Sequence, residues 1–278
     1  MTDFNQITHS DIDWIKLWQN ARNRKGWASK GPAEWDKKSS SFASRNKTSP
    51  YIDLLMSHLP LEADMTVLDV GSGPGTLALP IAKKVRSVTA LDFSPGMLAI
   101  LQDSARENGQ KNIRTVECAW EDDWDAKSIL PHDIAIASRS MSVDNIAEAI
   151  KKLNAHSSKY VFITDRISPT PFDPLLFEAL GRNFESGPDY IYTLNILYTM
   201  GIHPNVTILE LERELRFDNI DQALQSYSWM IKDLTTSEEH TLKRYLENTS
   251  TQDEQGQLVI HRDPPPRWAL IWWDCSNL

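Results

Sequence analysis

The sequence contains little cysteine and no long apolar segment. Its two cysteines, Cys118 and Cys275, lie far apart and form no CxxC pair, which excludes a disulfide scaffold and a zinc ribbon. No apolar run approaches the roughly 18 residues that a membrane span requires. The segment MTDFNQITHSDIDW lacks the basic and apolar regions of a secretory signal. We therefore expect a cytoplasmic protein with no membrane partner.

The sequence also contains fewer basic than acidic residues. The 278 residues carry 29 Lys and Arg against 38 Asp and Glu, a formal net charge of −9. Such a chain is poorly suited to bind nucleic acid, where affinity comes largely from neutralising phosphates. No cluster of His, Cys and Asp has the spacing of metal ligands, and no internal repeat occurs. We expect neither a nucleic-acid partner nor a metal.

Short β-branched, apolar runs alternate with helical stretches from residue 65 onward. The runs expected to form strands are 65–70, 87–91, 113–117, 133–138 and 160–165. The stretches expected to form helices between them are 76–85, 95–108 and 143–155. Strands that are apolar on both faces are typical of a parallel sheet covered by helices on both sides. The pattern predicts an α/β fold with a doubly wound, Rossmann-like sheet.

The chain divides into an N-terminal segment and a main domain. Residues 1–49 contain one amphipathic helix near 11–21, and we expect this segment to form a helical cover or lid. The main domain, 50–278, has its core at 65–165 and a C-terminal part at 166–278. That part is expected to add two strands and several helices, with strands at 206–212 and 267–273 and helices at 189–200, 220–231 and 237–246.

The segment VLDVGSGPGTLAL (67–79) joins the first strand to a helix through a glycine-rich turn. Glycines allow a sharp turn and a close ligand approach, and a helix N-terminus offers unpaired N–H groups. The dinucleotide fingerprint GxGxxG is not met, because Thr76 stands where its third glycine belongs. Asp69 would repel a pyrophosphate but attract an ammonium group. A purely structural turn is the alternative.

A second carboxylate follows the next strand. Asp92 ends the run 87–91, with Phe93 beside it. A carboxylate at this place can accept hydrogen bonds from both hydroxyls of a ribose. A ligand with an ammonium group at one end and a ribose in the middle fits S-adenosylmethionine.

The sequences DVGSGPG (69–75), LDFSPGML (91–98) and DIAIASRS (133–140) resemble those of class I S-adenosylmethionine-dependent methyltransferases, in the broad group that methylates small molecules. The resemblance is strong over about 65–165 and loose in the flanks. It implies a seven-stranded, mostly parallel sheet whose last strand, RWALIWW (267–273), runs antiparallel. It also implies cofactor contacts from Asp69, Gly71, Ser72, Gly73, Asp92, Phe93, Met97, Ala119, Trp120 and Ser138.

The resemblance gives these residues expected roles. The loop 71–73 would line the methionine and ribose, with Asp69 near the amino group. Asp92 would hold the ribose hydroxyls, and Phe93 and Met97 would pack beside the adenine.

One position departs from the family pattern. Cys118 stands where many members place an acid that binds the adenine amino group. We expect the backbone of Ala119 and Trp120 to edge the adenine, with Glu121 or Asp122 as a substitute acid. A solvated acidic loop is the alternative for these two acids.

Four residues are candidates for positions near the methyl acceptor. Ser138 would lie under the methyl-transfer position, and Arg139 after it could pair with a substrate carboxylate or with an acid of the protein. Trp35 and Phe42 belong to 27–47, which could order over the ligand, so that either residue would line the pocket. Packing on the surface of the domain is the alternative.

Other polar residues are more often structural than catalytic in such positions. These are the lone histidines His132 and His203 and the adjacent pair Asp165 and Arg166, which could form an ion pair.

The residues together predict methyl transfer from S-adenosylmethionine to a small molecule, at N, O, S or C. The sequence assigns no catalytic residue, and none is required, since a sulfonium is already activated and positioning can supply much of the acceleration. A scaffold that binds cofactor without turnover is an alternative. A nucleic-acid methyltransferase is disfavoured by charge and by Ser-Arg-Ser-Met at 138–141, where an Asn/Asp-Pro-Pro-aromatic sequence would be expected.

Overall fold

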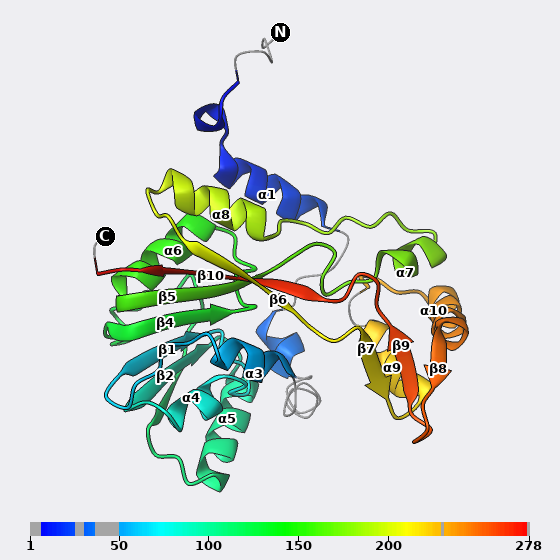
Figure 1. The fold of residues 1–278 in the computed structure, drawn as a ribbon, viewed down its shortest axis with the longest axis horizontal. Helices are drawn as coiled ribbons and strands as arrows, with labels where there is room; N and C mark the ends of the chain where they lie inside the picture. The colour runs from blue at the N-terminus through cyan, green and yellow to red at the C-terminus, as the bar shows by residue number, and fades with distance from the viewer. Residues whose placement is uncertain (1–6, 26–30, 37–49, 229–230, 277–278) are drawn as a thin grey trace.

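The large sheet is the centre of the molecule. A computed structural model describes residues 7–25, 31–36, 50–228 and 231–276. Within these ranges seven strands pair in the order β3-β2-β1-β4-β5-β10-β6 (Figure 1). They are β1 (Thr66–Val70), β2 (Ser87–Asp92), β3 (Ile113–Glu117), β4 (His132–Ser138), β5 (Ser157–Arg166), β6 (Asn205–Glu210) and β10 (Arg267–Asp274). β1 to β5 pair in parallel and β10 is antiparallel to β5 and β6, which confirms the predicted fold class and antiparallel last strand.

Helices cover both faces of this sheet (Figure 1). One face carries α3 (Pro50–Met56), α4 (Ala78–Ala82) and α5 (Pro95–Glu107). The other carries α1 (Trp14–Arg24), α6 (Ile146–Ala155) and α8 (Tyr190–Thr199). Among the described helices, none is both long and apolar enough to cross a bilayer.

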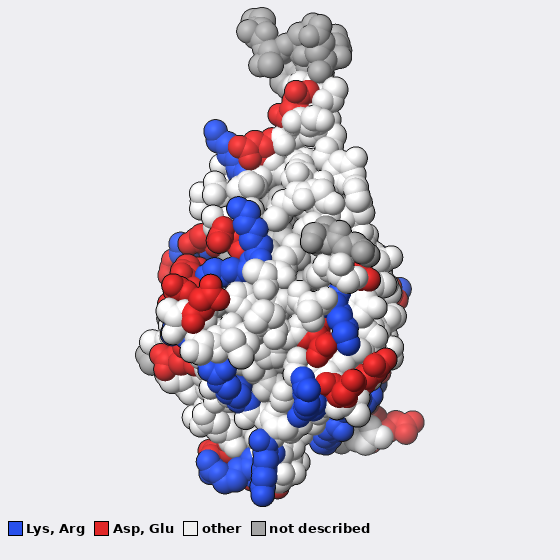
Figure 2. All heavy atoms as spheres, turned by 90° about the vertical axis from the view of Figure 1, so that its left-hand side faces the viewer, with Lys and Arg blue, Asp and Glu red and all other residues white. Residues whose placement is uncertain are grey.

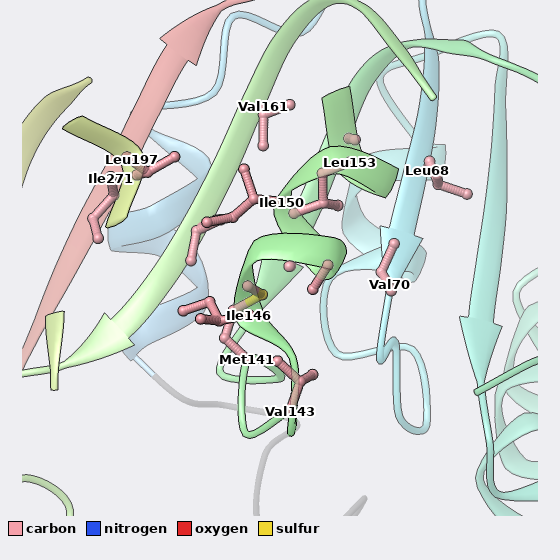
Figure 3. Close-up of a cluster of buried hydrophobic side chains, with 14 of the residues drawn as sticks. Leu68, Val70, Met141, Val143, Ile146, Ile150, Leu153, Val161, Leu197 and Ile271 are labelled. Atoms are coloured by element: carbon pink, nitrogen blue, oxygen red, sulfur yellow. The ribbon is translucent and has the colours of Figure 1, made fainter. Parts of the chain in front are cut away.

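The core on the α6 face shows why these segments become helices and strands. Ile146, Ile150 and Leu153 recur at helical spacing, so all three point from α6 toward the sheet, where Leu68 and Val161 face them (Figure 3). Each of the five is fully buried. Burying one such side chain stabilises the fold by about 1.5–3 kcal/mol, so this interface is a large part of the core energy.

Several expected helices differ from the structure at their ends: the one expected at 143–155 starts at Ile146, the one at 220–231 is Ile220–Ser228 and the one at 237–246 is Thr236–Thr249. The helix expected at 76–85 is only α4, and its start at Ala78 puts Pro80, which lacks an N–H, in the first turn, where proline is tolerated. The helix expected near 11–21 is α1, which starts later because Asp13 is its N-cap and accepts a hydrogen bond from the Lys16 N–H at 2.9 Å.

The insertion 211–266 between β6 and β10 forms a second, smaller sheet with the order β7-β9-β8. Its elements are β7 (Glu214–Phe217), α9 (Ile220–Ser228), α10 (Thr236–Thr249), β8 (Ser250–Gln252) and β9 (Leu258–His261). Its apolar core includes Tyr227, Leu242 and Leu246, with Leu176 from α7 (Pro174–Ala179). The sequence predicted its helices but not its strands, which at three or four residues are too short to show an alternating pattern.

The insertion lies beyond the carboxyl ends of β4 and β5 (Figure 1). β10 begins at Arg267, and Trp268 pairs with Arg166 at the end of β5. A doubly wound sheet binds its ligands at this carboxyl edge.

Candidate functional site

The glycine-rich turn after β1 is tied to the end of β2. The backbone N–H groups of Gly71 and Ser72 both donate to the Leu91 carbonyl, at 2.8 Å each. Gly71, Gly73 and Gly75 have φ values of +71°, +55° and +88°, a region that side chains rarely adopt. The turn therefore requires its glycines for backbone shape.

Two of these glycines also permit close packing. A Cβ at Gly71 would lie 2.4 Å from the Ser140 Cβ, and one at Gly75 would lie 2.3 Å from Cδ1 of Leu101 on α5. Ser140 in turn donates a hydrogen bond of 2.7 Å from its hydroxyl to the Val70 carbonyl. The turn is thus held between α5 and the segment that follows β4.

Asp92 also stabilises this turn, through hydrogen bonds to its carboxylate. Its Oδ2 accepts from the Gly73 N–H at 2.8 Å, and its Oδ1 accepts from the Ser94 N–H at 2.9 Å. Burial raises the pKa of Asp92, the N–H groups of Ser94, Gly73 and Phe93 lower it, and nearby Asp36 raises it. Each carboxylate oxygen has a second lone pair, so Asp92 can still accept hydrogen bonds from a ligand diol.

Asp69 is a buried acid at the mouth of the turn. Its side chain is 1% exposed. Burial is the main cause that raises its pKa to about 7, the charge of Asp92 adds to this, and the Ala78 N–H opposes it. Asp69 Oδ2 and the Ser72 hydroxyl are both buried without a hydrogen-bond partner in the described chain. Such orphaned buried atoms are rare, and they fit a ligand that brings hydrogen-bond donors, preferably cationic, to this turn.

Phe93 and Met97 lie at the start of α5. Ser94 is the N-cap of this helix and accepts from the Met97 N–H at 3.1 Å. Met97 is 2% exposed, whereas Phe93 is half-buried. The cap therefore fixes the backbone of the segment that carries both side chains, directly after Asp92.

The loop after β3 is stabilised by interactions of Asp122, one of its own residues. Asp122 accepts from the Ala119 N–H at 3.0 Å and pairs with Lys127 at 3.0 Å. The Trp120 ring N–H donates to the Ser140 carbonyl at 3.2 Å, which joins this loop to the segment after β4. Asp122 is thus used within the loop, while Glu121 is exposed.

Residues 31–36 bring a third acid to the same corner. Asp36 accepts a 2.5 Å hydrogen bond from the Ser94 hydroxyl and a 2.9 Å bond from the Gly96 N–H, in the first turn of α5. A helix N-terminus stabilises such a carboxylate. Trp35, one residue earlier, is half-buried, and Phe42 lies outside the described residues.

Three hydroxyls meet at the carboxyl ends of β4 and β5. The buried Tyr51 hydroxyl of α3 lies 2.6 Å from the Ser138 hydroxyl and 2.7 Å from that of Thr164. Ser138 and Thr164 are themselves 3.2 Å apart. This hydroxyl triangle fixes the Ser138 side chain at the edge of the sheet.

Arg139 follows directly, with its guanidinium over two aromatic rings. The guanidinium carbon lies 4.1 Å from the centre of the Tyr51 ring and 5.7 Å from that of Trp268. Its backbone has φ of +56° and its N–H donates to both the carbonyl and the hydroxyl of Thr164. The ion pair with a protein acid that the sequence left open is not formed with any described residue.

The sequence alone did not single out Tyr51, Asp36 or Trp268, although Asp36 lies in the segment 27–47 that was expected to order over the ligand. Each comes from a segment remote in the chain, and no local pattern distinguishes them from ordinary core or surface residues. Trp268 alone could have been found, because the predicted antiparallel last strand must begin where β5 ends.

The remaining polar candidates make structural contacts. His132 opens β4 at the opposite end of the sheet and its Nε2 lies 2.8 Å from the Thr89 hydroxyl. Asp165 accepts from the Thr193 hydroxyl at 2.6 Å, while the Arg166 guanidinium donates to the Pro188 carbonyl. His203 packs against the Tyr198 ring. Within the described ranges, no three His, Cys, Asp or Glu side chains are grouped as metal ligands would be.

Known proteins share both the sequence and the fold. A family model described as "Methyltransferase domain" matches residues 67–171. An uncharacterized protein of Haemophilus influenzae is 33% identical over 275 residues, which cover 98% of this chain and all of that protein. The YcgJ protein of Bacillus subtilis superposes with a TM-score of 0.56 at 16% identity, covering 80% of this chain and 97% of its own. A SAM-dependent methyltransferase from Aquifex aeolicus has a TM-score of 0.50 at 19% identity, covering 66% and 94%.

The close approach of Asp36 to α5 can be tested with Gly96→Ala. The new methyl group would lie 2.8 Å from the Asp36 carboxylate and 3.2 Å from its Cα, so the contact must open. Loss of one charged hydrogen bond is expected to speed amide exchange in 31–36 about tenfold. Gly31→Ala is the control, since nothing lies within 4 Å of its Cβ. Equal exchange in the two variants would show that 31–36 does not depend on this contact.

Proposed function

This chain belongs to the class I S-adenosylmethionine-dependent methyltransferase family, and on that premise we propose that it binds this cofactor at the turn after β1 and methylates a small molecule. The observation that carries the proposal is the buried Asp69 Oδ2, which has no partner among the described residues. A buried carboxylate is costly unless it is paired. The ammonium group of the cofactor would supply that partner.

The rest of the cofactor follows the carboxyl edge of β1, β2 and β3. Ser72 would bond the methionine part through its hydroxyl, with Gly71 and Gly73 allowing the close approach. Asp92 would accept from the ribose hydroxyls through its remaining lone pairs. The assignment is supported by the positions of both acids, which end adjacent parallel strands.

The adenine would lie beyond Asp92, between α5 and the loop after β3. Phe93 and Met97 would contact it from one side, and the backbone of Ala119 and Trp120 from the other. The Ala119 N–H is already bonded to Asp122, so this loop would contribute mainly shape and its remaining backbone groups.

The bound cofactor supplies an activated methyl group on a positively charged sulfur. What the chain must add is orientation of the acceptor and exclusion of water. Ser138 would border the reacting centre, because the hydroxyl triangle holds it at the carboxyl end of β4. We assign no general base to the chain.

The N-terminal segment would cover the end of the proposed cofactor site that holds the adenine. Asp36 accepts hydrogen bonds from Ser94, the neighbour of Phe93, and from Gly96, so Trp35 would lie near the proposed adenine site. This supports the role of residues 31–36 as part of a cover.

A small molecule is the better acceptor class on electrostatic grounds. The chain has a net charge of −9, and the face shown in Figure 2 carries acidic and basic side chains intermingled, without a basic stripe. The insertion 211–266 stands at the carboxyl edge, where it could enclose a compact acceptor (Figure 1).

Turnover can be tested with an isotopically methyl-labelled cofactor and a small-molecule cell extract. We expect S-adenosylhomocysteine and a labelled small product to form only when protein and extract are both present. Purified RNA and DNA are the parallel acceptors. If the label appears in nucleic acid, the acceptor is a nucleic acid and not a small molecule. If the protein binds the cofactor but methylates none of these acceptors, the scaffold alternative is favoured.

The role of Asp92 is tested by Asp92→Asn. Removing the charge should cost about 1.5–3 kcal/mol of binding free energy, which is about a 10- to 150-fold loss of S-adenosylhomocysteine affinity by calorimetry. Asp103→Asn is the matched control, because Asp103 is an exposed acid on α5 paired only with Arg106. Unchanged affinity in Asp92→Asn would remove this residue from the site.

A further inference from the structure

Arg139 is a half-buried cation with which no described acid forms an ion pair. Among the described residues, none offers its guanidinium a carboxylate within 4 Å or a hydrogen-bond acceptor. Three other arginines that are not fully exposed do have partners: Arg182 binds Glu238, Arg22 binds Asp144 and Arg262 donates to the Pro171 carbonyl. In a chain with nine more acids than bases, an unpaired guanidinium in this position calls for an explanation.

The backbone at this residue is held in an unfavourable conformation. Arg139 has φ of +56°, a left-handed conformation that costs free energy for a residue with a long side chain. Two hydrogen bonds from its N–H, to the Thr164 carbonyl at 3.1 Å and the Thr164 hydroxyl at 3.0 Å, hold it there. Backbone strain of this kind collects at functional sites. Its effect here is to direct the Arg139 side chain over Tyr51.

Two aromatic rings then hold the guanidinium. Tyr51 lies beneath it at 4.1 Å, and Trp268 flanks it at 5.7 Å. Contact with ring faces stabilises the cation while leaving its N–H groups, which lie in the plane of the guanidinium, available for hydrogen bonds. Tyr51 cannot turn away, because its hydroxyl is fixed by Ser138 and Thr164. The guanidinium is thus oriented before any ligand arrives.

We propose that Arg139 binds a carboxylate of the methyl acceptor, so that the substrate is an organic acid. The proposal rests on the proposed function, which puts the methyl-transfer position beside Ser138, the preceding residue. A planar guanidinium pairs with a carboxylate through two parallel hydrogen bonds, which fixes direction as well as distance. One cation matches a singly charged carboxylate better than a phosphate dianion.

The test is a titration of benzoate, a simple carboxylate probe, into the protein saturated with S-adenosylhomocysteine. Binding is detected by NMR, through changes in the N–H signals of the arginine side chains. We expect saturable benzoate binding to the wild type and none by benzamide, which has the same shape without the charge. Arg139→Asn should weaken benzoate at least about tenfold while S-adenosylhomocysteine affinity stays within about twofold. Asn is chosen because it tolerates a positive φ, so the backbone is retained.

Two further variants test whether benzoate binding depends on the charge of Arg139, on its planar pair of N–H donors, or on the loss of any arginine. Arg139→Lys should give an intermediate loss, because it keeps the charge but not the planar pair of donors. Arg106→Asn is the matched control, since Arg106 is an exposed arginine on α5, and it should change nothing. Thermal melting verifies that each variant is folded.

The outcomes are distinguishable. Equal benzoate affinity in wild type and Arg139→Asn, or no saturable benzoate binding to the wild type, would overturn the proposal. Tighter binding of inorganic phosphate than of benzoate would overturn the choice of a carboxylate. If S-adenosylhomocysteine does not bind but benzoate still depends on Arg139, the proposed function fails and the anion site stands.

Discussion

Asp69 and Asp92 end adjacent parallel strands, and both are buried without a cation from the described chain beside them. Burial raises the pKa of each, and the charge of Asp92 raises that of Asp69 further, to about 7. Keeping two like charges together in this way is unfavourable in the free protein. A ligand that carries positive charge and hydroxyls would relieve it, so under the proposed function the same feature that costs stability would select for the cofactor.

The surrounding structure is organised around this acid pair. Backbone N–H groups of the glycine turn bind Leu91 and Asp92, so the bonds that fold the turn also position the second acid. Asp36 from the N-terminal segment adds a third negative charge at the start of α5 and raises the pKa of Asp92. Arg139 lies elsewhere on this edge, directly after Ser138 at the end of β4. Acidic residues thus face the proposed cofactor, and a positive charge faces the proposed acceptor.

The sequence predicted what depends on local pattern and failed where distant segments meet. Apolar runs and the spacing of Asp69 and Asp92 sufficed for the large sheet and the acid pair, because strand ends of a parallel sheet share one edge. Tyr51 was missed because only folding brings α3 to β4 and β5. The strands of the insertion 211–266 were missed because their pairing, not their pattern, defines them. Residues at the ends of the strands, such as Asp69, Asp92, Ser138 and Arg139, could therefore be named from the sequence, whereas the partners that distant segments bring to them could not.

The central claim is that the buried acid pair binds the cofactor, with Asp69 at its ammonium group. The most direct test is the pH dependence of S-adenosylhomocysteine binding between pH 5.5 and 7.5, measured by calorimetry. In the free protein Asp69 is protonated below about pH 7, and an ammonium partner favours its ionised form. Binding must then release a proton, and affinity should rise about tenfold or more across this range. Methylthioadenosine, which lacks the amino-acid part, should show a much smaller change. S-adenosylhomocysteine affinity that is flat or falls with rising pH would contradict the account.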